Sequence, residues 1–408
     1  MKGIRPPDLL LALLVVNLGL DTVVLNLAGQ NRALVAVVVL SAAATGWYLR
    51  TGRLAALYVL VVLLFVTPES VLILLRPAHA AVDDALTATQ AAAQRLLSGH
   101  SPYGHDYINV ADLRSLFPVA VEFPVNPIFA HYPYPPGPIL LAVPFAATGL
   151  DYAWLWPPAA LLLAAAAHFA AGRVGLMVAA LNPLLLIDYL NLFNDLLFMA
   201  AALTAVGFLL RSNAFRAGLL LGVALALKQT AVVFVPVALI AFSGRRSLVA
   251  GMALSLGVTV LPFFLSNPAG MLTDTAAYFY GSGTASFPIR GLGLPGLLLK
   301  AGLIPSRWDA YPAALIQIPA LAAWLGFCWL RFRKRTAAPS AYWLCTGAVA
   351  AILFCFGRTL APNYITITVV LLGLGLGSLA FKDQAPMAAR IGRGEDPIGG
   401  REGEKSPA

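Results

Sequence analysis

The chain has 408 residues, of which 60% are hydrophobic and only 11% charged, with a formal net charge of +9. This composition excludes a soluble globular protein and is typical of an integral membrane protein that crosses the bilayer many times. The three cysteines, Cys328, Cys345 and Cys355, all fall inside apolar runs, which argues against a disulfide framework and against a thiolate metal site.

Apolar runs long enough to span a bilayer recur along the whole sequence. We expect membrane helices at 9–27, 32–49, 54–75, 152–171, 174–190, 195–210, 248–266, 311–330, 341–357 and 361–381. Three further runs are too short to cross alone: 138–149, 215–227 and 231–242. The sequence therefore predicts an all-α polytopic transmembrane bundle of about 10–13 membrane segments over residues 1–381, with one re-entrant piece between 138 and 190. The polar tail, 382–408, is expected to be disordered and cytoplasmic.

Short basic clusters lie between the apolar runs and fix the expected orientation. They are Lys2/Arg5, Arg50/Arg53, Arg211/Arg216, Arg245/Arg246 and Arg331/Arg333/Lys334/Arg335. The positive-inside rule places all of them in the cytoplasm. Both termini are therefore expected to be cytoplasmic, in the cell membrane, and residues 76–137 form a large loop outside. The positive charge reports this topology and contact with anionic lipids, and no nucleic-acid partner is expected.

The stretch 215–242 does not fit a single helix that crosses the membrane once. Arg216 and Arg245 both belong on the cytoplasmic side, yet only Lys228-Gln229-Thr230 interrupts the apolar run between them. A half of about 14 residues reaches only about 20 Å, against a hydrocarbon core of roughly 30 Å. Two half-helices that meet near Lys228 beside a water-filled cavity resolve the conflict. A charge near the bilayer centre costs roughly 2.5–3.5 kcal/mol, which favours a functional Lys228 over a lysine that snorkels from a helix end. The same reasoning makes 291–304 an amphipathic element at the outer surface.

The outer loop 76–137 holds four of the five histidines, the pair Asp83-Asp84 and a Tyr/Pro-rich end. The acidic pair precedes a helix-favouring run that stops at Gly99. Acidic residues there commonly cap the helix, but the position just beyond a span also suits a general base. The histidines, including His100, His105 and His131, are more often solvated than metal ligands. The loop tyrosines belong more often to an interfacial aromatic belt than to a sugar-stacking surface.

The order of several short motifs resembles one known family. D-D-x(14)-G-H-S-P-Y, followed by Y-P-Y-P-P-G-P, is similar to the first outer loop of the GT-C superfamily of polyprenyl-phosphate-sugar-dependent glycosyltransferases. The likeness is greatest to the glycosyltransferase 87 (DUF2029) mannosyltransferase branch. Further matches cover about 70–380 and follow in order: Asn182-Pro183, Asn194-Asp195, A-G-x(3)-G-x(5)-K ending at Lys228, Arg358, and Pro362-Asn363-Tyr364.

The resemblance implies a membrane enzyme that moves a hexose, with mannose as the default, from a polyprenyl- or dolichyl-phosphate donor to an acceptor hydroxyl outside the cell, with inversion. The acceptor is a lipid, a glycan or a protein. An Asp accepts the hydroxyl proton, and spacing back from Gly99 favours Asp84 over Asp83. The candidate substrate-binding residues are Lys228, Arg358, Arg290, Asp195, Tyr103, Tyr134 and Tyr364. A divalent cation, Mg or Mn, is an additional candidate for stabilising the phosphate.

Two other classes of function fit parts of the pattern. A secondary transporter or lipid flippase also uses broken helices and intramembrane charges. Against it, the two halves of the chain show no repeated hydropathy pattern, and a large outer loop with an acidic pair is atypical of transporters. A non-catalytic membrane scaffold leaves Lys228 and Arg358 unexplained.

Overall fold

The structure is a computed structural model that describes residues 6–27, 29–75, 84–107, 131–278, 287–309, 311–333 and 337–380. Nearly every described element is a helix, and the described strands are two short ones, β1 (Arg290–Gly291) and β2 (Thr359–Leu360). The predicted all-α membrane bundle is confirmed. The expected tail, 382–408, and residues 76–83 and 108–130 of the outer loop 76–137 lie outside the described residues.

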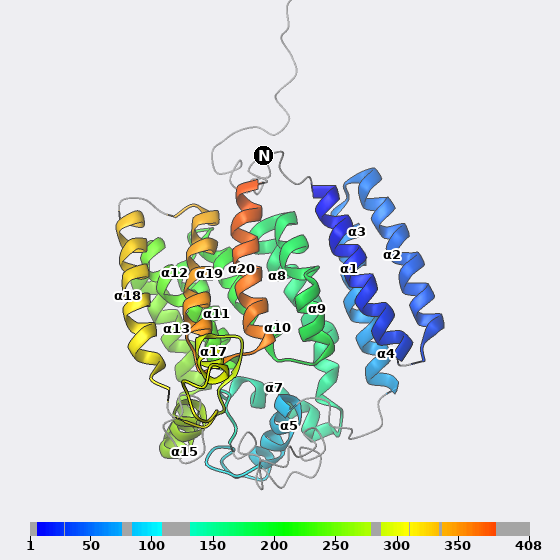
Figure 1. The fold of residues 1–408 in the computed structure, drawn as a ribbon. Helices are drawn as coiled ribbons and strands as arrows, with labels where there is room; N and C mark the ends of the chain where they lie inside the picture. The colour runs from blue at the N-terminus through cyan, green and yellow to red at the C-terminus, as the bar shows by residue number, and fades with distance from the viewer. Residues whose placement is uncertain are drawn as a thin grey trace, which may run out of the picture.

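The N-terminal helices form a group of their own at one side of the bundle (Figure 1). Helix α1 (Pro6–Leu27) is followed by α2 (Asn31–Thr51), which ends where Gly52 takes the left-handed conformation, with a φ of 63°. The third span is continuous through α3 (Leu54–Val61), the π-helical turn η1 (Val62–Val66) and α4 (Thr67–Leu75). These three elements match the first three predicted spans.

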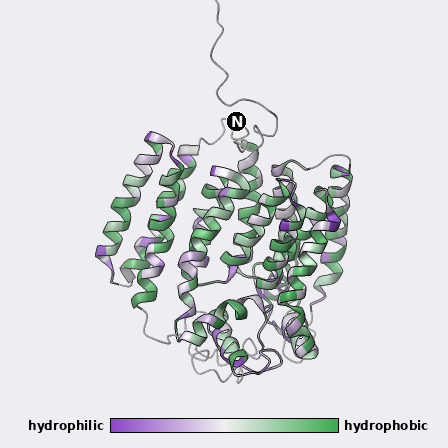
Figure 2. Cartoon of the chain, turned by 180° about the vertical axis from the view of Figure 1, so that it is seen from behind, coloured by the Kyte–Doolittle hydropathy of each residue, from purple (hydrophilic) through white to green (hydrophobic). Residues whose placement is uncertain are grey.

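In the described residues, six stretches are helical, long and apolar enough to cross a membrane. They are Asp8–Leu25, Arg32–Thr51, Leu54–Leu75, Tyr152–Ala180, Ala313–Phe332 and Pro362–Ala380. Several expected spans are shorter, such as α10 (Asp195–Leu209) and α19 (Pro339–Cys355). The long helices are apolar along most of their length (Figure 2), as expected of helices in contact with lipid.

The stretch Tyr152–Ala180 reverses direction within itself. It contains η3 (Tyr152–Leu155), α8 (Trp156–Gly175) and η4 (Leu176–Ala180), but Ala171 and Gly172 have non-helical backbone angles. A Cβ on Gly175 would lie 1.9 Å from the Ala167 carbonyl oxygen. Residues eight positions apart in a straight helix are separated by about 12 Å, so the chain turns back here. After η4 it continues into α9 (Pro183–Leu190), in agreement with two predicted segments on either side of residue 172.

The helix expected to break at Lys228 does break there. Helix α11 (Ala214–Leu227) ends at Lys228, which is extended, with φ −157° and ψ 129°. The chain resumes as the 3-10 helix η5 (Gln229–Phe234) and α12 (Val235–Ala241). Helix α11 packs closely against α13 (Arg245–Thr259), since a Cβ on Gly218 would lie 2.1 Å from the Leu248 carbonyl oxygen.

Short elements gather at one end of the bundle. They are α5 (Asp84–Leu97), α7 (Gly137–Thr148), α14 (Leu261–Ser266), α15 (Pro268–Leu272), η6 (Thr273–Ala277) and α17 (Leu294–Lys300). Helix α7 has only 12 residues and packs beside α5, so it is the piece between 138 and 190 that does not cross. The expected element at 291–304 contains α17, at the same end (Figure 1). Helices α18 (Ala313–Phe332), α19 and α20 (Pro362–Ala380) complete the bundle.

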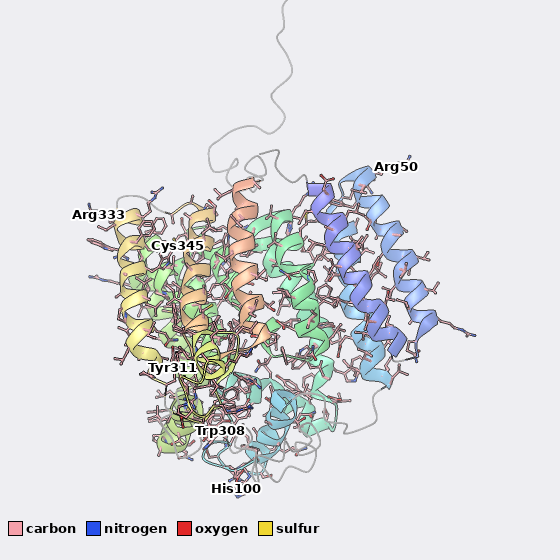
Figure 3. The ribbon with its side chains drawn as sticks, viewed as in Figure 1. Arg50, His100, Trp308, Tyr311, Arg333 and Cys345 are labelled. Carbon is pink, nitrogen blue, oxygen red and sulfur yellow. The ribbon has the colours of Figure 1, made fainter. Side chains whose placement is uncertain are left out.

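The basic clusters within the described chain meet at the opposite end. Arg50 and Arg333 lie at this end and His100 at the other (Figure 3). The Arg211 guanidinium donates to the Phe169 carbonyl, 2.9 Å away, and Gly244 lies against Ala214. Helix α1 begins and α20 ends at this end as well (Figure 1). This arrangement is the one that the positive-inside rule requires of a cytoplasmic face.

The orientation can be tested with Ser98→Cys and Ser243→Cys, two exposed positions at opposite ends of the bundle. The background carries Cys355→Ser, because Cys355 is exposed while the other two cysteines are buried. An impermeant maleimide added to intact cells should label Ser98→Cys and should label Ser243→Cys only after the cells are opened. Labelling in the reverse order would place the α5 end in the cytoplasm.

Candidate active site

A buried ion pair stands where helix α11 breaks. The Lys228 ammonium donates to the Asp195 Oδ1, 2.8 Å away, and to the Asn194 Oδ1, 2.7 Å away. The Asp195 Oδ2 accepts from the Asn363 Nδ2 at 2.8 Å. Lys228 is 4% exposed and Asp195 1%, so both charges are compensated inside the protein, as burial of charge requires. Two of the predicted site residues, Lys228 and Asp195, are thus in direct contact.

Three local breaks in secondary structure bring this cluster together. Asp195 is the first residue of α10, after a turn in which Leu192 has a φ of 56°. Lys228 is the extended residue between α11 and η5, and Asn363 lies in the first turn of α20. Polar groups freed by breaks at membrane depth need partners in the protein or a water-filled cavity. Here the side chains supply the partners and a cavity lies next to them.

The cavity has a volume of about 340 Å³ and lies between the broken helix and the elements of the α5 end. Lys228, Asn194 and Asn363 form part of its wall, and Ala85 and Ala88 bring the first turns of α5 to it. Tyr134, Tyr364 and Arg290 also line it. The cavity therefore lies against the α5 end of the bundle, because α5, the 131–134 segment and β1 all contribute to its wall.

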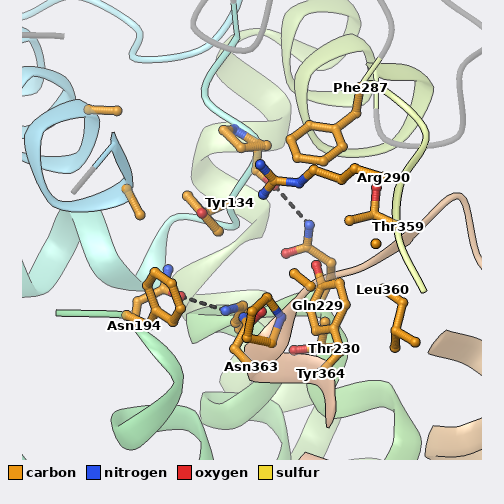
Figure 4. Close-up of a pocket in the computed structure, with 18 of the residues that line it drawn as sticks. Tyr134, Asn194, Gln229, Thr230, Phe287, Arg290, Thr359, Leu360, Asn363 and Tyr364 are labelled. Carbon is orange, nitrogen blue, oxygen red and sulfur yellow. Dashed lines mark hydrogen bonds between the residues drawn. The ribbon is translucent and has the colours of Figure 1, made fainter. Parts of the chain in front are cut away.

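Arg290 belongs to a segment that covers the cavity, residues 287–309, which we call the outer strap. Its guanidinium carbon lies 4.9 Å from the Phe287 ring centroid. No carboxylate lies within ion-pair distance of Arg290 among the residues that the structure describes. Figure 4 shows its side chain reaching from the strap toward Tyr134. Asp195 already compensates Lys228, so Arg290 is the cation of the cavity wall that has no carboxylate partner among the described side chains.

Arg358 does not line this cavity, in contrast to what the sequence suggested. It is 6% exposed, and its guanidinium donates to main-chain carbonyls of the outer strap. The acceptors are Phe287, Arg307 at 3.3 Å, Trp308 at 3.2 Å and Asp309 at 2.8 Å. Arg358 borders a neighbouring cavity of about 160 Å³ instead. A guanidinium has five N–H donors, so these contacts leave little capacity for a phosphate.

Arg358 therefore acts on the cavity through the strap. Directly after it, β2 pairs in parallel with β1, with Thr359 opposite Arg290. Gly291 is required at this pairing, since its φ is 89° and a Cβ there would lie 2.0 Å from the Leu360 carbonyl oxygen. Arg358 and the two strands fix the strap, and with it Arg290, over the cavity.

The predicted tyrosines divide into two groups. Tyr134 and Tyr364 line the cavity, and the Tyr364 ring stacks on Phe354 with centroids 4.6 Å apart. Tyr103 is 2% exposed, and its hydroxyl donates to the Tyr134 carbonyl at 2.9 Å. Burial raises the pKa of the Tyr103 hydroxyl, which keeps it protonated as a donor. Tyr103 thus holds the Tyr134 segment in place and does not reach the cavity wall.

The candidate base lies at the limit of the described chain. Helix α5 begins at Asp84, as expected, but Asp83 and the side chain of Asp84 lie outside the described residues. Ala85, the next residue, lines the cavity. The start of α5 therefore stands beside the Lys228 cluster.

A second pair of functional groups was not singled out from the sequence. His131 lines the cavity, and its Nδ1 lies 2.6 Å from Asp274 Oδ1. Asp274 is completely buried, and its Oδ2 accepts from the Gly104 N–H at 2.8 Å. The two residues are 143 positions apart, and no local pattern connects them. Among the described residues, no group of three or more His, Cys, Asp or Glu side chains is arranged to hold a metal ion.

The buried ion pair predicts how substitutions affect stability. Lys228→Met leaves the Asp195 charge buried without its cation and should lower the free energy of unfolding by about 3–5 kcal/mol. The double variant Lys228→Met/Asp195→Asn removes both charges and should recover most of this loss. Thermal unfolding of the purified protein in detergent measures both effects. Lys300→Met, at an exposed position of α17, is the control and should change stability by less than about 0.5 kcal/mol. Equal stability of the single variant and the native chain would mean that the pair is not buried.

Comparison with known proteins identifies the family to which the chain belongs. No similar curated protein and no similar solved structure was found. The model of glycosyltransferase family 87 matches residues 132–356, a range that contains Asp195, Lys228, Asp274 and Arg290. The match covers more than half of the chain and lies inside the stretch whose motifs resemble that family. The chain belongs to glycosyltransferase family 87, a branch of the GT-C glycosyltransferases.

Proposed function

We propose that this membrane glycosyltransferase moves a hexose, with mannose as the first candidate, from a polyprenyl- or dolichyl-phosphate donor to an acceptor hydroxyl. The reaction takes place on the extracytoplasmic side and inverts the anomeric centre. The acceptor is a lipid, a glycan or a protein. The protein lies in the cell membrane with both termini in the cytoplasm.

The observation that carries this proposal is the cavity at the break in the α11–η5 helix. It combines a buried Lys228, the Arg290 guanidinium and two asparagines in a volume of about 340 Å³. Small-ligand sites are commonly about 300–1,000 Å³ with a few placed polar groups, so a sugar phosphate fits the size and the chemistry. A donor whose lipid tail stays in the bilayer can reach a cavity that lies at the membrane end of the outer elements.

The chemistry follows from these groups. The acceptor oxygen attacks the anomeric carbon while the bond from that carbon to the phosphate oxygen breaks, and the bonding electrons pass to the phosphate. The acceptor proton passes to a carboxylate, for which we propose Asp84, or Asp83 in its place, at the start of α5. The departing phosphate gains a negative charge, which the Arg290 guanidinium stabilises and to which Lys228 can donate its remaining N–H.

The remaining residues hold these groups in position. Asp195 and Asn363 keep the Lys228 ammonium at the cavity wall and leave it one further N–H donor beside the two it uses. Tyr134 and Tyr364 present aromatic surface on which a sugar ring can pack. For Arg358 we replace the expected phosphate contact with the support of the outer strap described above.

Substitution of the two aspartates by asparagine tests the base. Asn caps a helix about as well as Asp but cannot accept a proton, so both variants should fold and insert normally. One of Asp84→Asn and Asp83→Asn should lose about 10²–10⁴ of the transfer rate, as expected when a positioned base is removed. Membranes that contain each variant are incubated with radiolabelled polyprenyl-phosphate mannose and native lipid extract, and labelled products are identified by mass.

The control is Asp151→Asn, because the Asp151 carboxylate accepts the Ala153 N–H at the start of η3 and does not line the cavity. This variant should transfer sugar at the native rate. Substantial transfer by Asp84→Asn, Asp83→Asn and the double variant would refute the assignment of the base. Transfer from a soluble nucleotide sugar and not from the lipid-linked one would refute the proposed donor.

A further inference from the structure

A histidine oriented by a buried aspartate is a common arrangement in enzyme active sites. The proposed reaction gives the His131–Asp274 pair no role. His131 is 18% exposed at its side chain, on the cavity wall, while Asp274 is 0% exposed behind it. The His131 ring also packs against Tyr278, with centroids 4.7 Å apart. Asp274 belongs to η6 (Thr273–Ala277), which is far from the 131–134 segment in the sequence. Asp274 and Tyr278 therefore fix the orientation of the His131 ring from two sides.

The contact with Asp274 fixes the orientation of the His131 imidazole. An ionised carboxylate only accepts hydrogen bonds, so Nδ1 of His131 carries a proton directed at Asp274. Asp274 is completely buried, and a buried carboxylate charge requires a compensating cation. In the described chain the group within ion-pair distance of it is His131. Because Asp274 engages Nδ1, Nε2 is the ring nitrogen left for a ligand in the cavity that His131 lines.

A hydrogen-bond donor at this position can stabilise the charge that develops on the phosphate. The Lys228 charge is compensated by Asp195 at 2.8 Å, so Lys228 adds little net positive charge. When the sugar leaves, the phosphate of the lipid passes from one negative charge to about two. A preorganised charged donor directed at the place where charge develops is the most effective way to stabilise it.

We propose that His131, held as an imidazolium by Asp274, donates its Nε2–H to the phosphate of the lipid-linked donor and of the lipid phosphate product. This inference rests on the proposed function and adds a phosphate ligand that the family motifs in this sequence do not include. His131 keeps both of its protons through the reaction, and the acceptor proton still passes to the aspartate at the start of α5. Asp274 is a positioning residue, since it acts only through the His131 ring.

The experiment measures binding and not turnover. Purified protein in detergent is titrated with polyprenyl phosphate and, in parallel, with the uncharged polyprenol of the same chain length. The native protein should bind the phosphate more tightly than the alcohol. His131→Gln and Asp274→Asn should each lose roughly tenfold to a hundredfold of the affinity for the phosphate, as expected for one charged hydrogen bond. Both variants should keep the native affinity for polyprenol. A purely structural defect would instead lower the affinity for both lipids.

The control is His100→Gln, since His100 lies at the tip of the outer end, away from the cavity (Figure 3), and it should bind both lipids as the native protein does. An unchanged preference for the phosphate in His131→Gln would overturn the inference while leaving the proposed donor intact. Loss of affinity for both lipids in both variants would also overturn it, because the pair would then support only the fold. If the native protein itself shows no preference for the phosphate, the proposed lipid-phosphate donor is wrong and the inference falls with it.

Discussion

The organisation of this protein depends on the cost of placing a lysine at membrane depth. An ammonium in hydrocarbon is unfavourable by several kcal/mol unless it has partners. The chain supplies them from the break at residues 194–195, and Asn363, at the start of α20, donates to the second oxygen of Asp195. Each break in turn exposes main-chain groups that need a cavity or a protein partner. The buried ion pair, the interrupted helices and the cavity therefore require one another. A change in any one of them is expected to affect the other two.

The outer strap adds a second layer to this core. It carries Arg290, and it is attached to the bundle by the β1–β2 pairing and by the Arg358 guanidinium. A guanidinium suits this role because its planar donors can bind several carbonyl oxygens at once. The resulting cavity is lined at the break in the bundle by Lys228, whose charge Asp195 compensates, and at the outer strap by Arg290. That asymmetry fits a ligand whose lipid tail enters from the bilayer and whose phosphate lies toward the outer surface.

The sequence predicted those parts of the site that follow from hydropathy and charge. The break at Lys228 could be foreseen because a 14-residue half-helix cannot cross the core, and Asn194-Asp195, Lys228 and Asn363 fall in motifs shared with the family. The role of Arg358 could not be foreseen, because its carbonyl partners come from residues 287 and 307–309, and main-chain contacts leave no pattern of side chains. The same holds for His131 and Asp274, where a loop histidine gave no sign of its buried partner. Tyr103 was misjudged for a related reason, since interfacial tyrosines look alike in sequence whether their hydroxyls face a cavity or a carbonyl group.

The central claim is that the break at Lys228 forms the phosphate site of a lipid-linked donor. A cryo-electron microscopy structure of the protein with bound polyprenyl phosphate tests this claim most directly. The account predicts the phosphate within hydrogen-bonding distance of Lys228 and Arg290, in the cavity of about 340 Å³. A phosphate bound in the neighbouring cavity beside Arg358, or on the far side of the outer strap, would contradict it.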